Sequence, residues 1–118
     1  MGHLSTHVLD TMHGCPAAGM QGRLLRIDGA SAPHPIASFT LDADGRPGGP
    51  LLDAQAMAAG RYRLVFAVAA YFRARGVALP EPPFLDEVAL DFGIADAAGH
   101  YHVPLLISPW SYSTYRGS

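Results

Sequence analysis

The sequence predicts an all-β sandwich, and two kinds of observation support this fold class. Short segments in which apolar and polar side chains alternate recur along the 118 residues, and this alternation is typical of strands with one buried face. Turn signals separate the segments at Asp28-Gly29, Ala43-Asp44-Gly45, Pro47-Gly48-Gly49-Pro50 and Ala97-Ala98-Gly99. Short strands between glycine- and proline-rich turns favour two packed layers of sheet.

The segments between these turns predict seven strands and one helix. The strands are expected at Leu4–Thr11, Gln21–Ile27, Ile36–Leu41, Tyr62–Val68, Glu87–Ile94, Tyr101–Ile107 and Ser111–Tyr115. A short helix is expected at Ala69–Arg75, because this run contains good helix formers and Gly76 follows as a stop. No repeat or long linker divides the chain, so residues 1–118 are expected to form one domain.

Composition argues against several classes of function. Apolar residues make up 49% of the chain and charged residues 15%, which favours a well-buried globular protein over a disordered one. A net charge of −2 without a basic run does not favour a nucleic acid or membrane partner. The single cysteine, Cys15, has no Cys-x-x-Cys partner, so we expect a packing role. The N-terminal segment has no secretory pattern, and the cytoplasm is the expected location.

The predicted strand Tyr101–Ile107 has one face with the composition of a core and one of a different kind. Alternate side chains of a strand point to the same side. The core-like face carries Tyr101, Val103, Leu105 and Ile107. The opposite face combines imidazole with apolar side chains: His100, His102, Pro104 and Leu106. A subunit interface that encloses a polar cavity would account for both properties.

The first and last predicted strands suggest the same kind of surface. One face of the first strand carries Ser5, His7 and Leu9. Tyr115 stands at the end of the last strand, and Arg116-Gly117-Ser118 completes a compact group of aromatic, cationic and hydroxyl side chains beside the terminal carboxylate. If the faces bearing His7, His102 and Tyr115 meet in the fold, they form one polar site on an apolar floor.

Six runs of the sequence together carry a resemblance to a known family. They are Leu4-Ser5-Thr6-His7-Val8-Leu9-Asp10, Gly14-Cys15-Pro16-Ala17, Ala43-Asp44-Gly45-Arg46, Gly60-Arg61-Tyr62-Arg63-Leu64, Ala70-Tyr71-Phe72 and Tyr115-Arg116-Gly117-Ser118. In these runs the chain resembles the transthyretin-like 5-hydroxyisourate hydrolases of purine catabolism, from about Leu4 to its end. The last run is the most specific, because the hormone-carrying transthyretins lack it. The resemblance implies a transthyretin-like sandwich of two four-stranded sheets with one short helix, assembled as a homotetramer around a channel.

The resemblance also implies a reaction and the residues that perform it. Water would open the six-membered ring of 5-hydroxyisourate at a ring amide and yield 2-oxo-4-hydroxy-4-carboxy-5-ureidoimidazoline. The family's catalytic positions fall on His7, Arg46, His102 and Ser118, and its substrate contacts fall on His7, Arg46, Tyr115 and Arg116. No cofactor and no metal ion is implied.

These residue types suit the implied chemistry. A guanidinium fork can donate paired hydrogen bonds to a carbonyl edge and stabilise the charge of a tetrahedral intermediate, which is the role expected of Arg46. A histidine that is neutral near pH 7 can deprotonate water, and such acid–base catalysis typically contributes about 10²–10⁴-fold. We expect His7 and His102 to divide the transfer of protons, and the pattern leaves open which of them is the base.

Two other functions compete with hydrolysis, and two of the histidines have an alternative role as metal ligands. A transthyretin-like protein could carry a small aromatic ligand in its channel, although a passive carrier needs neither the histidines nor the terminal tetrapeptide. A β-sandwich interaction module would not explain imidazoles on an apolar face. His100 and His102 could ligate a metal ion from one strand face, but a third ligand is not obvious.

Two further features of the sequence bear on the site. A serine triad drawing on Asp10 and on Ser108, Ser111 or Ser113 lacks the Gly-x-Ser-x-Gly elbow that would support it. The remaining histidines stand in terminal or turn contexts and are expected to be solvated: His3, His13 and His34.

Overall fold

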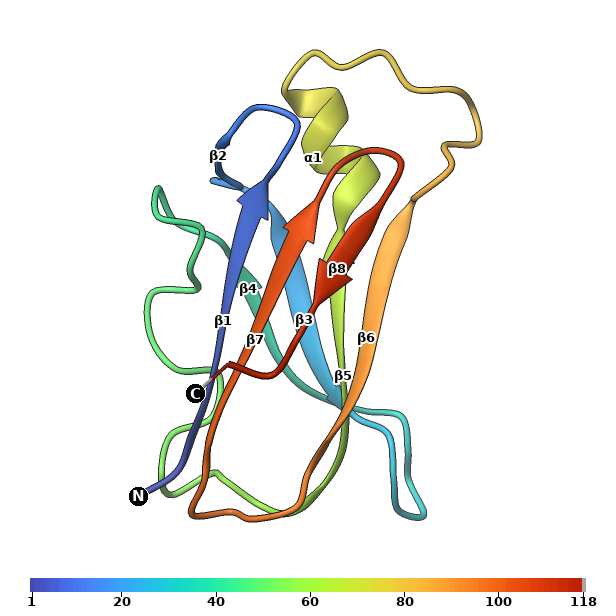
Figure 1. Ribbon diagram of the computed structural model, residues 1–118. Helices are drawn as coiled ribbons and strands as arrows, with labels where there is room; N and C mark the ends of the chain where they lie inside the picture. Colours follow the sequence, from blue (N-terminus) through green and yellow to red (C-terminus); the bar gives the residue numbers. More distant parts are fainter. Residues whose placement is uncertain (118) are drawn as a thin grey trace.

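A computed structural model, which describes residues 1–117, consists of two four-stranded sheets packed face to face (Figure 1). One sheet has the order β2-β1-β7-β8, with bounds Cys15–Pro16, His3–Asp10, His100–Ile107 and Tyr112–Thr114. The other has the order β4-β3-β5-β6, with bounds His34–Thr40, Gln21–Arg26, Gly60–Ala67 and Glu87–Ile94. The helix α1, Val68–Ala74, follows β5 directly. The predicted sandwich of two four-stranded sheets with one short helix is confirmed.

The predicted bounds of the seven strands and the helix differ from the structure by at most two residues. The eighth strand, β2, was not predicted because its two residues are too few to show alternation. Among residues 1–117, no helix has the length and apolar character that a membrane crossing requires.

The core lies between the sheets and is formed by one face of each long strand. In β7 the side chains of Tyr101, Val103, Leu105 and Ile107 are all buried, as the alternation predicts. They face a second layer from β3 and β5 that includes Leu24, Leu64 and Phe66, each 0% exposed. Complete burial of a large apolar side chain contributes roughly 1.5–3 kcal/mol to the stability of the fold. The core therefore fixes which faces of β1 and β7 remain outside.

The strands β1 and β7 pair in parallel, whereas the other paired strands are antiparallel. This central pair aligns Ser5 with His102 and His7 with Pro104. Segments that are almost a whole chain length apart in the sequence thereby become neighbours. The register decides which polar side chains meet on the outer face.

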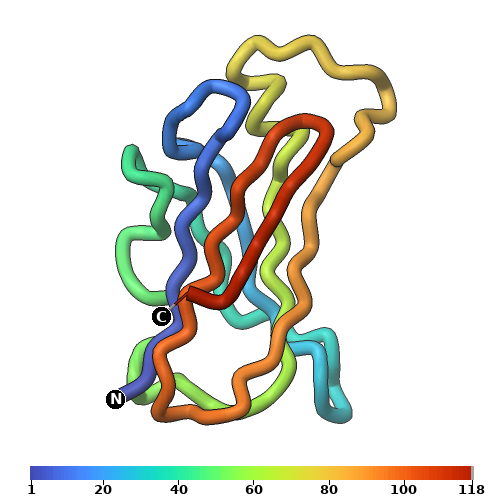
Figure 2. The backbone as a smooth tube through the Cα atoms, viewed as in Figure 1, coloured from blue at the N-terminus to red at the C-terminus, as the bar shows by residue number. Residues whose placement is uncertain are grey.

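The last strand is shorter than predicted, because β8 ends at Thr114 rather than at Tyr115. Pro104 of β7 stands opposite the next position and has no N–H group to continue the ladder. The Thr114 hydroxyl instead donates to the Pro104 carbonyl over 2.7 Å. Pairing resumes three residues further along each strand, where the Gly117 N–H donates to the His102 carbonyl over 2.6 Å. Figure 2 shows the end of the chain turning from β8 towards β7 and β1.

Candidate active site

Two predicted site histidines lie on the outer face of the parallel strands β1 and β7. His7 and His102 are both half-buried, whereas their strand neighbours Thr6 and Val103 point inward and are buried. Because Ser5 pairs with His102 and His7 stands two residues beyond Ser5, the two histidines are diagonal neighbours on one surface. The sequence left open whether the faces bearing His7 and His102 meet, and the register of β1 and β7 brings these two together.

The imidazole of His102 is held on two of its edges. The Ser5 hydroxyl oxygen lies 2.8 Å from Nδ1, within hydrogen-bonding distance. The Gly117 backbone lies against the Cδ2 edge, where a Cβ atom on residue 117 would approach Cδ2 to 2.9 Å. The backbone of His102 is fixed as well, because its carbonyl accepts the Gly117 N–H. The Nε2 nitrogen is the part of the ring that these contacts leave free.

The surroundings of His102 favour its neutral form. Burial lowers the pKa of His102, and nearby positive charge on Arg46, His7 and His3 lowers it further. A neutral imidazole retains a lone pair near pH 7 and can accept a proton from water or substrate. The electrostatics of this face therefore fit a general base at His102.

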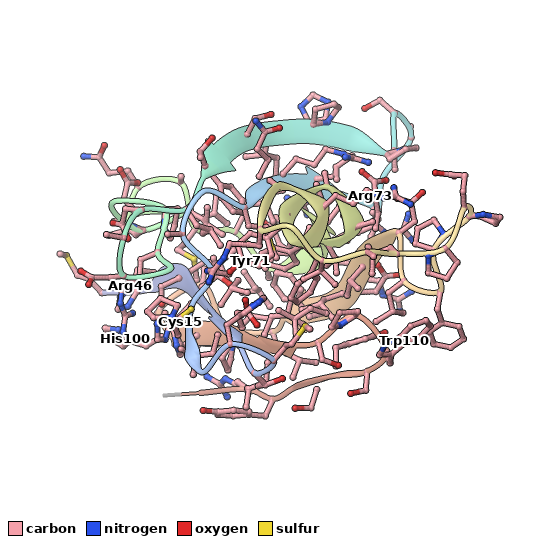
Figure 3. The ribbon with its side chains drawn as sticks, turned by 90° about the horizontal axis from the view of Figure 1, so that it is seen from above. Cys15, Arg46, Tyr71, Arg73, His100 and Trp110 are labelled. Carbon is pink, nitrogen blue, oxygen red and sulfur yellow. The ribbon has the colours of Figure 1, made fainter. Side chains whose placement is uncertain are left out.

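Arg46 reaches this face from a tight loop that is anchored on β1. The Val8 N–H donates to the Gly45 carbonyl over 2.9 Å, and Asp42 accepts the Arg46 N–H over 3.1 Å. Gly45 has φ +76°, and a Cβ atom there would lie 2.5 Å from the Val8 oxygen, so only glycine fits. The exposed Arg46 side chain lies on the same side of the molecule as His100 in Figure 3.

A second pair of histidines adjoins the first. His3 Nδ1 lies 2.8 Å from His100 Nδ1, and the two rings meet edge to face with centroids 4.4 Å apart. His3, which we expected to be solvated, is half-buried in this contact. Within residues 1–117, no group of three or more His, Cys, Asp and Glu side chains is arranged to hold a metal ion. The contact that the structure gives the His100 ring is with His3.

The terminal tetrapeptide is divided between the site and its surroundings. Arg116 lies over the Tyr101 ring at 4.1 Å and donates to the His100 carbonyl over 3.1 Å, so it fastens the tail to β7. Tyr115 is 61% exposed and lines a groove between β6 and β8, and no hydrogen bond in the described part of the chain links it to His7 or His102. Ser118 lies outside the described residues.

The serine triad considered above is not assembled. Asp10 is 0% exposed and accepts hydrogen bonds from the His13 ring at 2.6 Å and from the Tyr71 hydroxyl at 2.8 Å. Ser108 is hydrogen-bonded to Ser111 within the β7–β8 turn. His13 is thus engaged by a buried carboxylate, whereas we expected it to be solvated. Cys15, on β2, accepts a contact from Arg75 at 3.5 Å, which agrees with a packing role.

Two residues that support the site were not singled out from the sequence. Ser5 was placed on the same strand face as His7, but its contact with His102 depends on the parallel register of β1 and β7. Gly117 belongs to the terminal run, and its role depends on the return of the chain to His102. Period-two alternation can indicate a shared face, but it cannot indicate which strands are neighbours.

Comparisons with known proteins agree on one family. A model of the HIUase/Transthyretin family matches residues 4–117. The 5-hydroxyisourate hydrolase of Pseudomonas aeruginosa is 56% identical over 118 residues, covering 100% of this chain and 93% of that protein. The enzyme of the same name from Ralstonia nicotianae is 55% identical, with 100% of both chains covered.

Two solved structures share the fold. The 5-hydroxyisourate hydrolase of Klebsiella pneumoniae superposes with a TM-score of 0.82 at 35% identity and full coverage of both chains. A crystal structure of (S)-allantoin synthase superposes with a TM-score of 0.93 at 44% identity and 99% coverage of this chain. The present chain spans 44% of the length of that synthase chain.

Proposed function

The chain belongs to the HIUase/transthyretin family, and from this membership we propose that it is an enzyme that hydrolyses 5-hydroxyisourate. One observation carries the proposal beyond resemblance: His7, His102 and the anchored Arg46 loop gather on one outer face of β1 and β7. A proton acceptor, a second imidazole and a guanidinium are the groups that hydrolysis of a carbonyl-rich ring requires.

In the proposed reaction, water attacks a carbonyl carbon of a ring amide. His102 accepts a proton from the water as the new C–O bond forms, because its neutral form is favoured by burial and by neighbouring positive charge. The ring C–N bond then breaks, and the leaving nitrogen takes up a proton for which His7 is the proposed donor. The product is a carboxylate, so no oxidant or other reactant is needed.

Arg46 is the proposed orienting group for the substrate. Its guanidinium can donate two parallel hydrogen bonds to a carbonyl edge and stabilise the negative charge of the tetrahedral intermediate. Its anchoring through Asp42 and Gly45 supports this role, because a preorganised donor requires little reorganisation when charge develops. Arg46→Lys should retain little of the wild-type activity, because an ammonium group cannot form the paired hydrogen bonds of a guanidinium.

The tail contributes in two ways in this proposal. Tyr115, Arg116 and Ser118 were predicted as site residues, and Arg116 already ties the tail to the backbone of His100. We assign substrate contact to Tyr115 and Arg116, and assistance to a histidine or water to Ser118. A variant truncated after Thr114 tests these roles together, and full activity in that variant would exclude them.

We also propose that the enzyme is a homotetramer in which facing copies cover this outer surface. The outer face carries apolar side chains beside the histidines, among them Leu9 at 36% exposure and the half-buried Leu106. Both β6 and β8 are end strands of their sheets, and exposed aromatic side chains lie close to them at Phe84 and Trp110. Light scattering coupled to gel filtration measures the assembly. A cytoplasmic location stays a prediction from the sequence.

The deciding experiment follows the loss of freshly prepared 5-hydroxyisourate by absorbance, with and without the purified protein. An enzyme accelerates the spontaneous decay in proportion to its concentration, whereas a carrier binds the ligand without turnover. His102→Gln and His7→Gln should each reduce the acceleration by about 10²–10⁴-fold. His34→Gln, at an exposed position at the start of β4, is the matched control and should keep wild-type rates. A folded wild-type protein that does not accelerate the decay would support the carrier.

A further inference from the structure

Ser5 contacts the proposed base of the reaction but has no role in the chemistry described so far. It lies on β1 directly opposite His102 of β7, and both side chains point to the outer face. Its hydroxyl oxygen is 2.8 Å from His102 Nδ1. Both side chains are half-buried, so this hydrogen bond is partly shielded from competing water.

The two edges of the imidazole that are held decide which nitrogen can react. Nδ1 is engaged by Ser5, and the Cδ2 edge is covered by the Gly117 backbone. Within residues 1–117, no hydrogen bond engages Nε2, and in this proposal it faces a water molecule or substrate. A neutral histidine carries a proton on one nitrogen and a lone pair on the other, so the hydrogen bond at Nδ1 determines what Nε2 can do.

We propose that Ser5 is a positioning residue that accepts a hydrogen bond from Nδ1–H of His102 and thereby keeps the Nε2 lone pair directed at the attacking water. Nδ1 then carries a proton both before and after Nε2 takes one from water, so the hydroxyl group need not reorient during the reaction. Such preorganisation is the property that makes a hydrogen bond useful in catalysis. The catalytic part of this inference rests on the proposed hydrolase activity.

The kinetic test compares Ser5→Ala with Ser5→Thr. Loss of the hydroxyl should reduce kcat about tenfold and leave KM within about twofold, because in this proposal Ser5 acts on the direction of the proton acceptor and not on substrate binding. Threonine keeps a hydroxyl at the same position and should restore at least half of the lost activity. Ser38→Ala, at an exposed position of β4 on the other sheet, is the matched control and should behave as wild type. Equal kcat values for Ser5→Ala and wild type would overturn the proposal.

The pH dependence of kcat/KM separates positioning from a merely structural effect. The Ser5 hydroxyl accepts a stronger hydrogen bond from a charged imidazolium than from a neutral ring. Its removal should therefore move the acid limb of the profile to lower pH. The charged and titratable groups that act on His102, namely Arg46, His7 and His3, are unchanged in the variant. An acid limb that stays in place while kcat falls would contradict the proposed contact.

Nuclear magnetic resonance tests the proton position without any turnover. Protein labelled with ¹⁵N at its six histidines gives long-range proton–nitrogen correlations that distinguish the two neutral tautomers, and His102→Gln identifies the relevant signals. We expect the Nδ1–H tautomer in wild type and in Ser5→Thr, and a shift towards Nε2–H in Ser5→Ala. An Nε2–H tautomer in wild type would overturn the proposal. Because this readout needs no substrate, it remains decisive even if the protein fails to hydrolyse 5-hydroxyisourate.

Discussion

Replacement of Gly117 by alanine should reduce turnover while leaving the fold intact. A Cβ atom at residue 117 would lie 2.9 Å from Cδ2 of His102, which is 0.5 Å less than the 3.4 Å at which ordinary van der Waals contact begins. His102 cannot yield through its backbone, because it is paired with Ser5 on one side and bonded to Gly117 on the other. The imidazole must rotate or the tail must move away from β7.

The structure sets the size of the expected effect. A ring displacement of 0.5 Å away from residue 117 would press Nδ1 towards the Ser5 hydroxyl, where the 2.8 Å hydrogen bond cannot shorten to about 2.3 Å without falling below the usual lower limit of about 2.7 Å, so the ring must rotate out of this hydrogen bond. Misplacement of a catalytic group by about 1 Å can cost about 10²-fold, so we expect kcat to fall by about 10- to 100-fold. Overpacking costs about 1–3 kcal/mol in a core, and the lower end applies to Gly117 because the tail can shift.

The assay is the accelerated loss of 5-hydroxyisourate, measured beside urea unfolding of the same preparations. Gly93→Ala is the matched control, because a Cβ atom there meets nothing within 4 Å. It should keep wild-type kinetics, assembly and stability. If the Gly117→Ala and Gly93→Ala variants both hydrolyse 5-hydroxyisourate at the wild-type rate, the Gly117 backbone does not position the His102 ring and the reasoning fails.

Three further predictions concern the Arg46 loop, the pH profile and the buried carboxylate. Gly45→Ala should cost about 1–3 kcal/mol in urea unfolding and lower the affinity for substrate, because its backbone has φ +76° and Arg46 would be displaced; unchanged stability and KM would contradict this. The acid limb of kcat/KM should have its midpoint below 6.5, because the pKa of His102 is lowered and its neutral form is the proposed base; a midpoint above 6.5 would assign the limb to another group. Burial acts to raise the pKa of Asp10, but the hydrogen bonds from His13 and Tyr71 together outweigh it, so that pKa lies below the ordinary 3.8. The resulting stabilisation is complete above pH 3.8 and is lost as the pH falls through the lower folded value, so thermal unfolding of Asp10→Asn should depend less on pH in that range; an unchanged slope would assign the acid sensitivity elsewhere.

The sequence predicts those features of the structure that follow from the alternation of side chains along each strand. Tyr101 and Val103 are inside and His102 is outside because side chains of a strand alternate, and this holds wherever a strand has one buried face. The same rule placed Ser5 and His7 together. It required no knowledge of the neighbouring strands, so a single sequence was sufficient.

The other features depend on relations that alternation does not encode. The contact between Ser5 and His102 requires parallel pairing of two strands that are far apart in sequence. Arg46 lies in a loop, where there is no period to read, and only the family resemblance indicated it. The end of β8 at Thr114 results from a missing N–H on Pro104 in the neighbouring strand, which becomes relevant only once the register is known.

The exposure of the site in a single chain argues that catalysis depends on assembly. Arg46 and His100 are exposed and His7 is half-buried. Two unit charges 4 Å apart interact by only about 1 kcal/mol in bulk water but by about 4 kcal/mol near a protein surface with an effective dielectric constant of about 20. A second copy that covers this face would exclude water and strengthen the contacts of Arg46 with developing charge.

The consequence can be tested by disrupting the proposed interface at a residue outside the proposed catalytic groups. Leu9→Arg replaces an apolar side chain that is 36% exposed on the face of His7. It should yield smaller assemblies by light scattering and a specific activity that falls in parallel. Ile36→Arg, at a residue that is 38% exposed on β4 of the other sheet, is the matched control and should leave both properties unchanged. Monomers of Leu9→Arg that retain full turnover would show that one outer face provides the complete site, because the electrostatic effect of a covering subunit would then contribute nothing.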